Sequence, residues 1–213
     1  MKKASRLVCL LAVISVFGSV SYGATIGFEA ESGTIAGYSI ANDAGASDGK
    51  CIVGVNRSTS APGTDTASYT VNFAQTGSWY LYAHVFAPAP GWDSFFAPSD
   101  FATLATPASR VNGTGDVSPG TWLWIGVTQD ITSVLVPEAQ FSQSEPLEYY
   151  NVTATGEATF AIAGREENLR IDKFVFSTEL DLTPAELTAA PEPATMTLLS
   201  IGALAMLRRR RRR

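Results

Sequence analysis

Two glutamates near the start of the chain, Glu29 and Glu31, are separated by a single residue. If this segment is a β-strand, alternate side chains point to the same face and the two carboxylates lie side by side. Like charges at that spacing repel each other unless a cation lies between them. Carboxylate oxygens without His or Cys favour a hard ion such as Ca²⁺. We therefore predict a metal site at this pair; the alternative is two solvated surface glutamates.

Catalytic side chains are scarce. The sequence has one histidine, His84, inside the aromatic run 79–86. A Ser-His-Asp triad would depend on that residue, and we expect no Gly-x-Ser-x-Gly elbow to supply its nucleophile. Glu166 and Glu167 are adjacent, so in a strand they would point to opposite faces, whereas a glycosidase needs two converging acids. We predict a protein that is not an enzyme and a hydrogen-bonded His84 in a sheet; the alternative is a hydrolase with His84 in a cleft.

Tryptophans could bind a sugar, because sugars stack their C–H faces on aromatic rings. Trp92 lies in the turn 90–93, where it has little core to fill. Trp122 and Trp124 alternate along a run and therefore share a face, which is either core or binding platform. Trp79 is predicted to be a core residue.

The elements that must position these side chains are strands. Through residues 24–180, alternating runs rich in β-branched and aromatic residues are broken by Gly, Pro, Asn and Asp, and no helical period is sustained. Many short strands in one domain favour a β-sandwich or jelly roll. We predict an all-β jelly-roll β-sandwich with strands at 25–31, 50–55, 67–73, 78–87, 93–97, 121–127, 146–153, 157–163 and 169–177.

Several motifs in this body resemble those of carbohydrate-binding modules of families six and thirty-five. Phe28–Glu31 is similar to their opening Glu-Ala-Glu strand, residues 69–81 to their Tyr-x-Val and Gly-x-Tyr hairpin, and Gly164–Phe174 to their closing Ile-Asp-x-Phe strand. The resemblance implies a galactose-binding-like fold. It also implies a structural Ca²⁺ that joins the two ends of the domain, with Glu29, Glu31 and Asp172 as ligands.

The same resemblance implies a sugar site at the loops, although Val55-Asn56 stands where the modules commonly have an aromatic residue. The residues that we expect to bind carbohydrate are Trp92, Asp93, Trp122, Trp124 and Asn168.

Charge is distributed unevenly along the chain. The chain has 15 basic and 20 acidic residues; the two ends, 1–23 and 191–213, together hold nine of the basic residues and one of the acidic residues. Residues 24–190 therefore hold six basic and 19 acidic residues, which gives a formal charge of −13. Such a body repels phosphate backbones and attracts cations. We therefore expect no nucleic-acid partner.

The N-terminus has the pattern of a secretory signal peptide. Lys2 and Lys3 precede the apolar run 7–17, and the small residues Ser21 and Gly23 stand at the −3 and −1 positions of a cleavage site. We predict a signal peptide at 1–23, removed by signal peptidase. Cys51 is then the sole remaining cysteine, and its apolar run predicts a buried, inert thiol.

The C-terminus combines a motif, an apolar segment and a basic tail. Pro191, Glu192 and Pro193 precede residues 194–207, which are followed by arginines at 208–213. As a helix the apolar segment would span about 21 Å, less than a hydrocarbon core of about 30 Å, so we expect transient membrane contact with the arginines inside. This ending resembles the PEP-CTERM sorting signal, which implies cleavage by an exosortase, a membrane transpeptidase-like enzyme; the alternative is a tail anchor.

These observations predict a domain at 24–180, a linker at 181–190 and a sorting signal at 191–213. They favour a non-catalytic protein exported to the cell surface, outer envelope or extracellular matrix of a Gram-negative-type bacterium. Its expected partner is a polysaccharide or exopolysaccharide. The first alternative is a structural matrix protein without a sugar site, and the second is a carbohydrate-active hydrolase.

Overall fold

The computed structural model describes residues 23–58, 62–89, 92, 94–97, 101, 109–112, 120–127, 134–136 and 150–191, with only the backbone at 109–112 and 134–136. The predicted apolar segment at 194–207, residues 1–22 of the predicted signal peptide, Glu192 and Pro193 lie outside these ranges. Among the described residues, no helix is both long and apolar enough to span a membrane.

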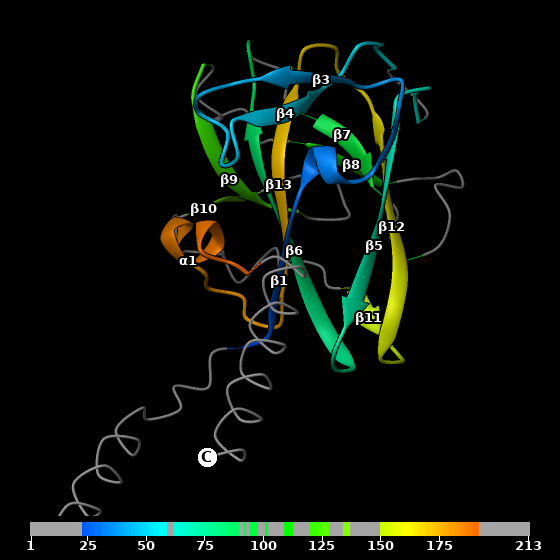
Figure 1. The fold of residues 1–213 in the computed structure, drawn as a ribbon, viewed down its shortest axis with the longest axis vertical. Helices are drawn as coiled ribbons and strands as arrows, with labels where there is room; N and C mark the ends of the chain where they lie inside the picture. The colour runs from blue at the N-terminus through cyan, green and yellow to red at the C-terminus, as the bar shows by residue number, and fades with distance from the viewer. Residues whose placement is uncertain are drawn as a thin grey trace, which may run out of the picture.

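The described chain forms two antiparallel β-sheets (Figure 1). In the larger sheet the strand order is β10-β9-β6-β13-β4-β3, with β1 also paired to β13 and β11 to β6. Its strands are β1 (Thr25–Glu29), β3 (Ser39–Asn42), β4 (Lys50–Val53), β6 (Gly77–Phe86), β9 (Trp122–Gly126), β10 (Val134–Val136), β11 (Tyr150–Val152) and β13 (Arg170–Ser177). The smaller sheet has the order β2-β5-β12-β7-β8, formed by β2 (Thr34–Ala36), β5 (Thr66–Phe73), β12 (Gly156–Gly164), β7 (Ser94–Ala97) and β8 (Ser109–Asn112).

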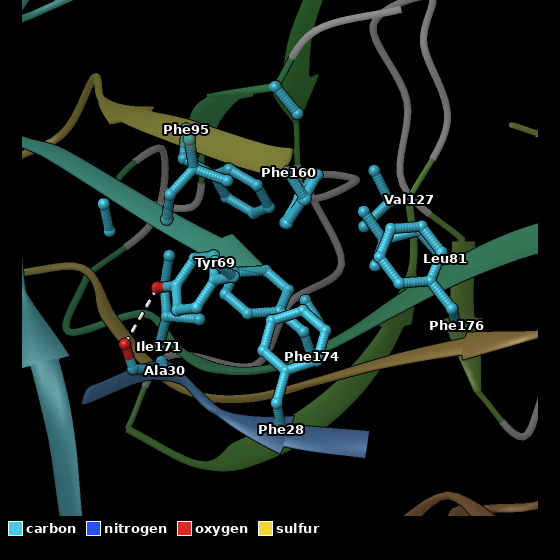
Figure 2. Packing of buried hydrophobic residues seen from close by; sticks show 14 of the residues in the cluster. Phe28, Ala30, Tyr69, Leu81, Phe95, Val127, Phe160, Ile171, Phe174 and Phe176 are labelled. Carbon is cyan, nitrogen blue, oxygen red and sulfur yellow. Dashed lines mark hydrogen bonds between the residues drawn. The ribbon is translucent and has the colours of Figure 1, made fainter. Parts of the chain in front are cut away.

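The two sheets bury an aromatic core between them. Figure 2 shows Phe28 of β1 and Phe174 of β13 packed with Tyr69 and Phe160 from the facing sheet. The Tyr69 hydroxyl donates a hydrogen bond of 2.8 Å to the carbonyl of Ala30, so its polar end is also satisfied. Alternation along β5 and β12 sends every second side chain into this core, as expected for antiparallel strands with one solvated face. The predicted all-β sandwich is confirmed.

Each predicted strand range contains a strand of the structure. The sequence patterns missed four others: β2, β3, β8 and β10. In β2 and β3 no residue is buried, so neither strand shows the apolar alternation on which the prediction depends. Trp79 and Cys51 are completely buried, as predicted, and burial raises the pKa of the Cys51 thiol to about 11, which keeps it protonated and unreactive.

The segment expected to be a linker is folded onto the larger sheet. It contains the helix α1 (Pro184–Thr188), drawn in orange in Figure 1. Thr183 caps this helix through a capping box with Glu186. The helix has only five residues, too few to show a sustained helical period in the sequence. Leu182 and Leu187 are buried in a second apolar cluster on the outer face of the sheet. The domain therefore extends to the edge of the sorting signal.

Candidate functional site

The first and last strands of the domain bring the predicted metal ligands together. β1 is antiparallel to β13, and Glu29 lies opposite Lys173. On the other side of β13, Lys173 is also opposite His84 of β6, and the pairing register shifts between Ile171 and Lys173. Such an irregularity turns a side chain away from its regular direction. Here the displaced residue is Asp172, whose buried carboxylate contacts His84.

A serine connects the two ends of the domain. The Ser47 hydroxyl donates to Glu29 Oε2 at 2.8 Å and lies 3.1 Å from Asp172 Oδ1. Its backbone N–H lies 3.0 Å from both Asp172 oxygens. Glu29 also forms an ion pair with the buried Lys173, with 3.1 Å between Oε1 and Nζ. Burial is the main cause that raises the pKa of Glu29, although Ser47 and Lys173 act in the opposite direction.

Glu31 is not placed as a strand residue. β1 ends at Glu29, and Glu31 lies in the short 3₁₀ helix η1 (Ala30–Ser32). The argument from strand alternation is therefore wrong for this pair, although both side chains face the charge of Asp172. Glu31 Oε2 is buried and accepts no hydrogen bond from the described residues. Burial raises the pKa of Glu31, and the nearby charges of Asp172 and Asp48 raise it further.

The chemistry of this cluster fits a hard cation in part. An unpartnered carboxylate oxygen on Glu31 and the carboxylates of Glu29 and Asp172 supply the oxygen donors that Ca²⁺ prefers. The ammonium of Lys173 already neutralises Glu29. Within the described part of the chain, no three His, Cys, Asp or Glu side chains are gathered closely enough to hold a metal ion. The calcium site therefore stays a prediction.

Ser47 lies at the centre of a Gly-x-Ser-x-Gly spacing, Gly45 to Gly49, so our expectation that the sequence lacks this pattern is wrong. The segment is a hairpin turn between β3 and β4 and not the strand-to-helix elbow of a hydrolase. In a triad the histidine lies between serine and aspartate. Here Asp172 lies between Ser47 and His84, because His84 Nδ1 is 2.6 Å from Asp172 Oδ2. This order does not activate the serine.

His84 is a hydrogen-bonded sheet residue, as predicted, and it also stacks on two tryptophans. Its ring centroid lies 5.0 Å from that of Trp122 and 4.9 Å from that of Trp124. Trp122 and Trp124 share a face of β9, which the alternation predicted. Trp124 is buried among the residues that α1 covers, and its Nε1 donates to Thr188 Oγ1 at 3.3 Å. Trp124 is therefore a core residue and not part of an exposed binding platform.

Trp122 is half-buried on the outer face of the larger sheet, at the end where β9 begins. Its ring packs on Phe86 at 5.6 Å between centroids, and the guanidinium of Arg170 lies 4.8 Å from the Phe86 ring centre. Trp122 Nε1 donates to Asp43 Oδ1 at 3.3 Å, and Arg170 binds the other carboxylate oxygen. We call Asp43, Phe86, Trp122 and Arg170 the aromatic ledge.

Asp43 holds the ledge in place. Its carboxylate accepts a hydrogen bond from the backbone N–H of Gly45, which is the largest of the causes that lower its pKa; Arg170 and Trp122 lower it further. A side chain at Gly45 would lie 2.3 Å from Trp122 Cδ1, so glycine lets the turn approach the indole closely. Sequence reasoning named Arg170 as a polar contact for a sugar but missed Asp43 and Phe86. The turn signal of Asp43-Ala44-Gly45 was present, but its contact with β9 depends on the fold.

Two of the remaining sugar candidates, Trp92 and Asn168, lie in the described part of the chain. Trp92 is half-buried, and its backbone N–H donates to Ala89; Asp93 lies outside the described residues. Asn168 is exposed with a positive φ of 63°, and its N–H donates to the carbonyl of Gly54 at 2.7 Å. It precedes Arg170 of the ledge by two residues. The structure thus brings Asn168 and Trp122 toward one end of the larger sheet, whereas Trp124 is covered.

Sequence comparison accounts for the end of the chain. Residues 189–213 match the family model of the PEP-CTERM protein-sorting motif. The chain carries a PEP-CTERM sorting signal. This signal implies processing by an exosortase and indicates an exported protein at the cell envelope or surface. No curated protein matches the sequence.

Solved structures with a similar fold include isolated carbohydrate-binding modules. A family 6 module of the laminarinase LamC from Zobellia galactanivorans has 13% identity and a TM-score of 0.47, over 72% of this chain and 99% of the module. A family 35 module from Clostridium thermocellum has 14% identity and a TM-score of 0.46, over 71% and 98%. This chain spans only 29% of a similar Podospora anserina GH26-CBM35 β-(1,4)-mannanase, at 12% identity, a TM-score of 0.46 and 76% coverage of this chain.

Proposed function

We propose that this PEP-CTERM protein is a non-catalytic carbohydrate-binding protein, exported to the envelope or extracellular matrix of a Gram-negative-type bacterium. Its partner is a polysaccharide or exopolysaccharide, and the aromatic ledge is the surface that contacts it. We also propose a structural Ca²⁺ at Glu29, Glu31 and Asp172; these side chains would have to move closer together to bind it, because they are not gathered closely enough in the described chain.

The observation that carries the proposal is the setting of Trp122. A half-buried indole on an outer sheet face has flanking polar groups on Asp43 and Arg170, which can exchange hydrogen bonds with hydroxyl groups. Small-ligand sites commonly combine aromatic side chains with a small number of precisely placed polar groups. His84 and Phe86 both pack against the ring, so the indole is held in one orientation before a sugar arrives.

The acidic body supports the same reading indirectly. Its formal charge of −13 over residues 24–190 disfavours polyanionic partners such as nucleic acid. Neutral polysaccharides bind through stacking and hydrogen bonds and suffer no such repulsion. We therefore propose a glycan that is neutral or weakly charged.

A structural matrix protein is the competing proposal, and binding measurements separate the two. The exported protein would be titrated in Ca²⁺ against an array of neutral and acidic polysaccharides. Trp122→Ala should abolish binding to the recognised glycan, and Trp122→Phe should retain part of it, because a smaller ring still stacks.

The matched control is Thr70→Ala, an exposed position on β5 of the opposite sheet. It should bind like the unchanged protein. Trp92→Ala tests the loop candidate separately. If no glycan binds, or if Trp122→Ala binds as well as the control, the ledge is not a sugar site and the matrix-protein alternative gains support.

A further inference from the structure

The segment 178–191, which we call the strap, runs from the end of β13 to the first residue of the sorting motif. Thr178 donates its backbone N–H to the carbonyl of Ala24 at 3.0 Å, which places the start of the strap beside β1. The Tyr82 hydroxyl of β6 donates to the carbonyls of Glu179 and Leu180. The strap is therefore bound to the sheet by its backbone from its first residues.

The middle of the strap is held by apolar contacts. Leu187 of α1 is completely buried and packs in one cluster with Tyr82, Trp124 and Val175 of the sheet. Trp124 also binds Thr188 through its indole nitrogen. Removal of a completely buried leucine side chain from water stabilises the closed position of the strap. Release of the strap from the sheet thus has a real free-energy cost.

The end of the strap attaches the sorting motif itself to the domain. The backbone N–H of Gly27 in β1 donates to the carbonyl of Pro191 at 3.2 Å. Ala190 is buried, and a side chain on Gly27 would lie only 2.9 Å from the Ala190 carbonyl oxygen. The absence of a side chain at Gly27 is what allows this close approach. Pro191, the first residue of the Pro-Glu-Pro motif, is therefore part of the folded domain.

We propose that this docking makes strap release a required step before exosortase processing. The processing enzyme cuts one peptide bond near the motif. The acyl group passes to water or to an acceptor amine, and the C-terminal fragment leaves as a free amine that takes up the proton the acceptor loses. An enzyme that does this needs an accessible, extended segment around the bond. While Pro191 stays on Gly27 and α1 stays on the sheet, the residues on the domain side of the motif are held by helical and backbone contacts and cannot adopt the extended form, although Thr188 and Ala189 are exposed.

The rate of processing then follows the population of the released state. When opening and closing are faster than cleavage, cleavage of a transiently opened segment depends on how often the segment is open. The strap contains both the buried residues that stabilise the closed state and the residues next to the motif, so a change in its packing changes how often the motif is released. The inference rests on the sorting signal and is independent of the proposed sugar site.

The experiment measures conversion of the full-length precursor to the processed form by pulse-chase in an exosortase-containing host. Leu187→Ala weakens the strap without changing its length, and it should speed processing by about tenfold or more, because truncation of a buried leucine shifts an opening equilibrium by more than one power of ten. A second variant inserts four Gly/Ser residues between Ala190 and Pro191. It frees the motif while the contacts of α1 stay intact, and it should also be processed faster.

The matched control is Ala185→Ser on the exposed side of α1, which should be processed like the unchanged chain. The insertion variant covers the case in which Leu187→Ala fails to fold, since it leaves the buried cluster unchanged. Faster processing of the insertion variant supports the proposal. An unchanged or slower rate for that variant overturns it, because the motif then does not have to leave the domain.

Discussion

The imidazole Nδ1 of His84 lies 2.6 Å from the carboxylate Oδ2 of Asp172, so two features of the domain share one contact. Asp172 belongs to the polar cluster that joins the first and last strands, and the ring of His84 packs against Trp122 of the aromatic ledge at 5.0 Å between centroids. A change at either residue is therefore expected to affect both the stability of this polar cluster and the position of the ledge.

Replacement of Asp172 by Asn tests this connection. Asn keeps the shape but places an amide donor where the carboxylate accepts hydrogen bonds from Ser47 and contacts His84. The free energy of unfolding should fall by about 1–3 kcal/mol, the usual cost of leaving buried polar groups unsatisfied. Urea denaturation followed by tryptophan fluorescence measures it. The control, Asp48→Asn at an exposed turn position, should stay within about 0.5 kcal/mol; an equal loss in both variants would contradict the prediction.

Calcium should stabilise the protein if the predicted site exists. A ligand that binds only the folded state at about 100 times its Kd adds about 2.7 kcal/mol to stability. The Tm should therefore rise on addition of Ca²⁺ and return to its starting value with EDTA. Glu31→Gln should remove most of that rise, because its buried carboxylate oxygen Oε2 has no hydrogen-bond partner among the described residues. Glu157→Gln, exposed on β12, should keep the full rise. If Ca²⁺ does not change the Tm of the unchanged protein, the predicted calcium site at Glu29, Glu31 and Asp172 does not exist.

Acidification should loosen the aromatic ledge. Hydrogen bonds from Gly45 and Trp122, and the contact with Arg170, lower the pKa of Asp43 from its ordinary value of 3.8. A carboxyl group with a lowered folded pKa adds stability that is fully present above the unfolded value and is lost as the pH falls through the folded value. The stability difference between the unchanged protein and Asp43→Asn should thus be largest above about pH 5 and shrink below 3.8. Acid titration of both proteins in urea measures it, and a difference that does not change with pH would refute the assignment.

Gly54 is expected to tolerate no side chain. A methyl group there would lie 2.2 Å from the backbone carbonyl oxygen of Glu166, and backbone atoms cannot move aside as a flexible side chain can. Gly54→Ala should therefore destabilise the fold by about 1–3 kcal/mol or more through overpacking. Val55→Ala, at the next and exposed position, serves as the control and should change stability little. Thermal unfolding of the two variants tests this prediction. Similar Tm values for Gly54→Ala and Val55→Ala would contradict it, because the backbone at Glu166 would then be able to move away from the added methyl group.

Features that depend on neighbouring residues could be predicted from the sequence. Alternation of apolar and polar side chains located the strands of the core, and the order of basic, apolar and Pro-Glu-Pro segments located the sorting signal. Both patterns are local, because strand period and membrane insertion depend on residues within one short window. The same reasoning placed His84 in a sheet and Cys51 in the core.

Contacts between distant residues were decided by the tertiary structure alone. Ser47 and Asp172 meet across 125 positions of sequence, and His84 and Asp172 across 88. Such contacts depend on strand register and on the irregularity at Asp172, which no local pattern encodes. For the same reason the sequence patterns did not predict that Glu31 lies in a 3₁₀ helix or that Asp43 contacts Trp122. They also did not predict that the expected linker packs on the sheet and that its neighbour Pro191 binds Gly27. The sequence determined which residues this protein has for binding and sorting, and the packing of its two sheets determined which of them meet.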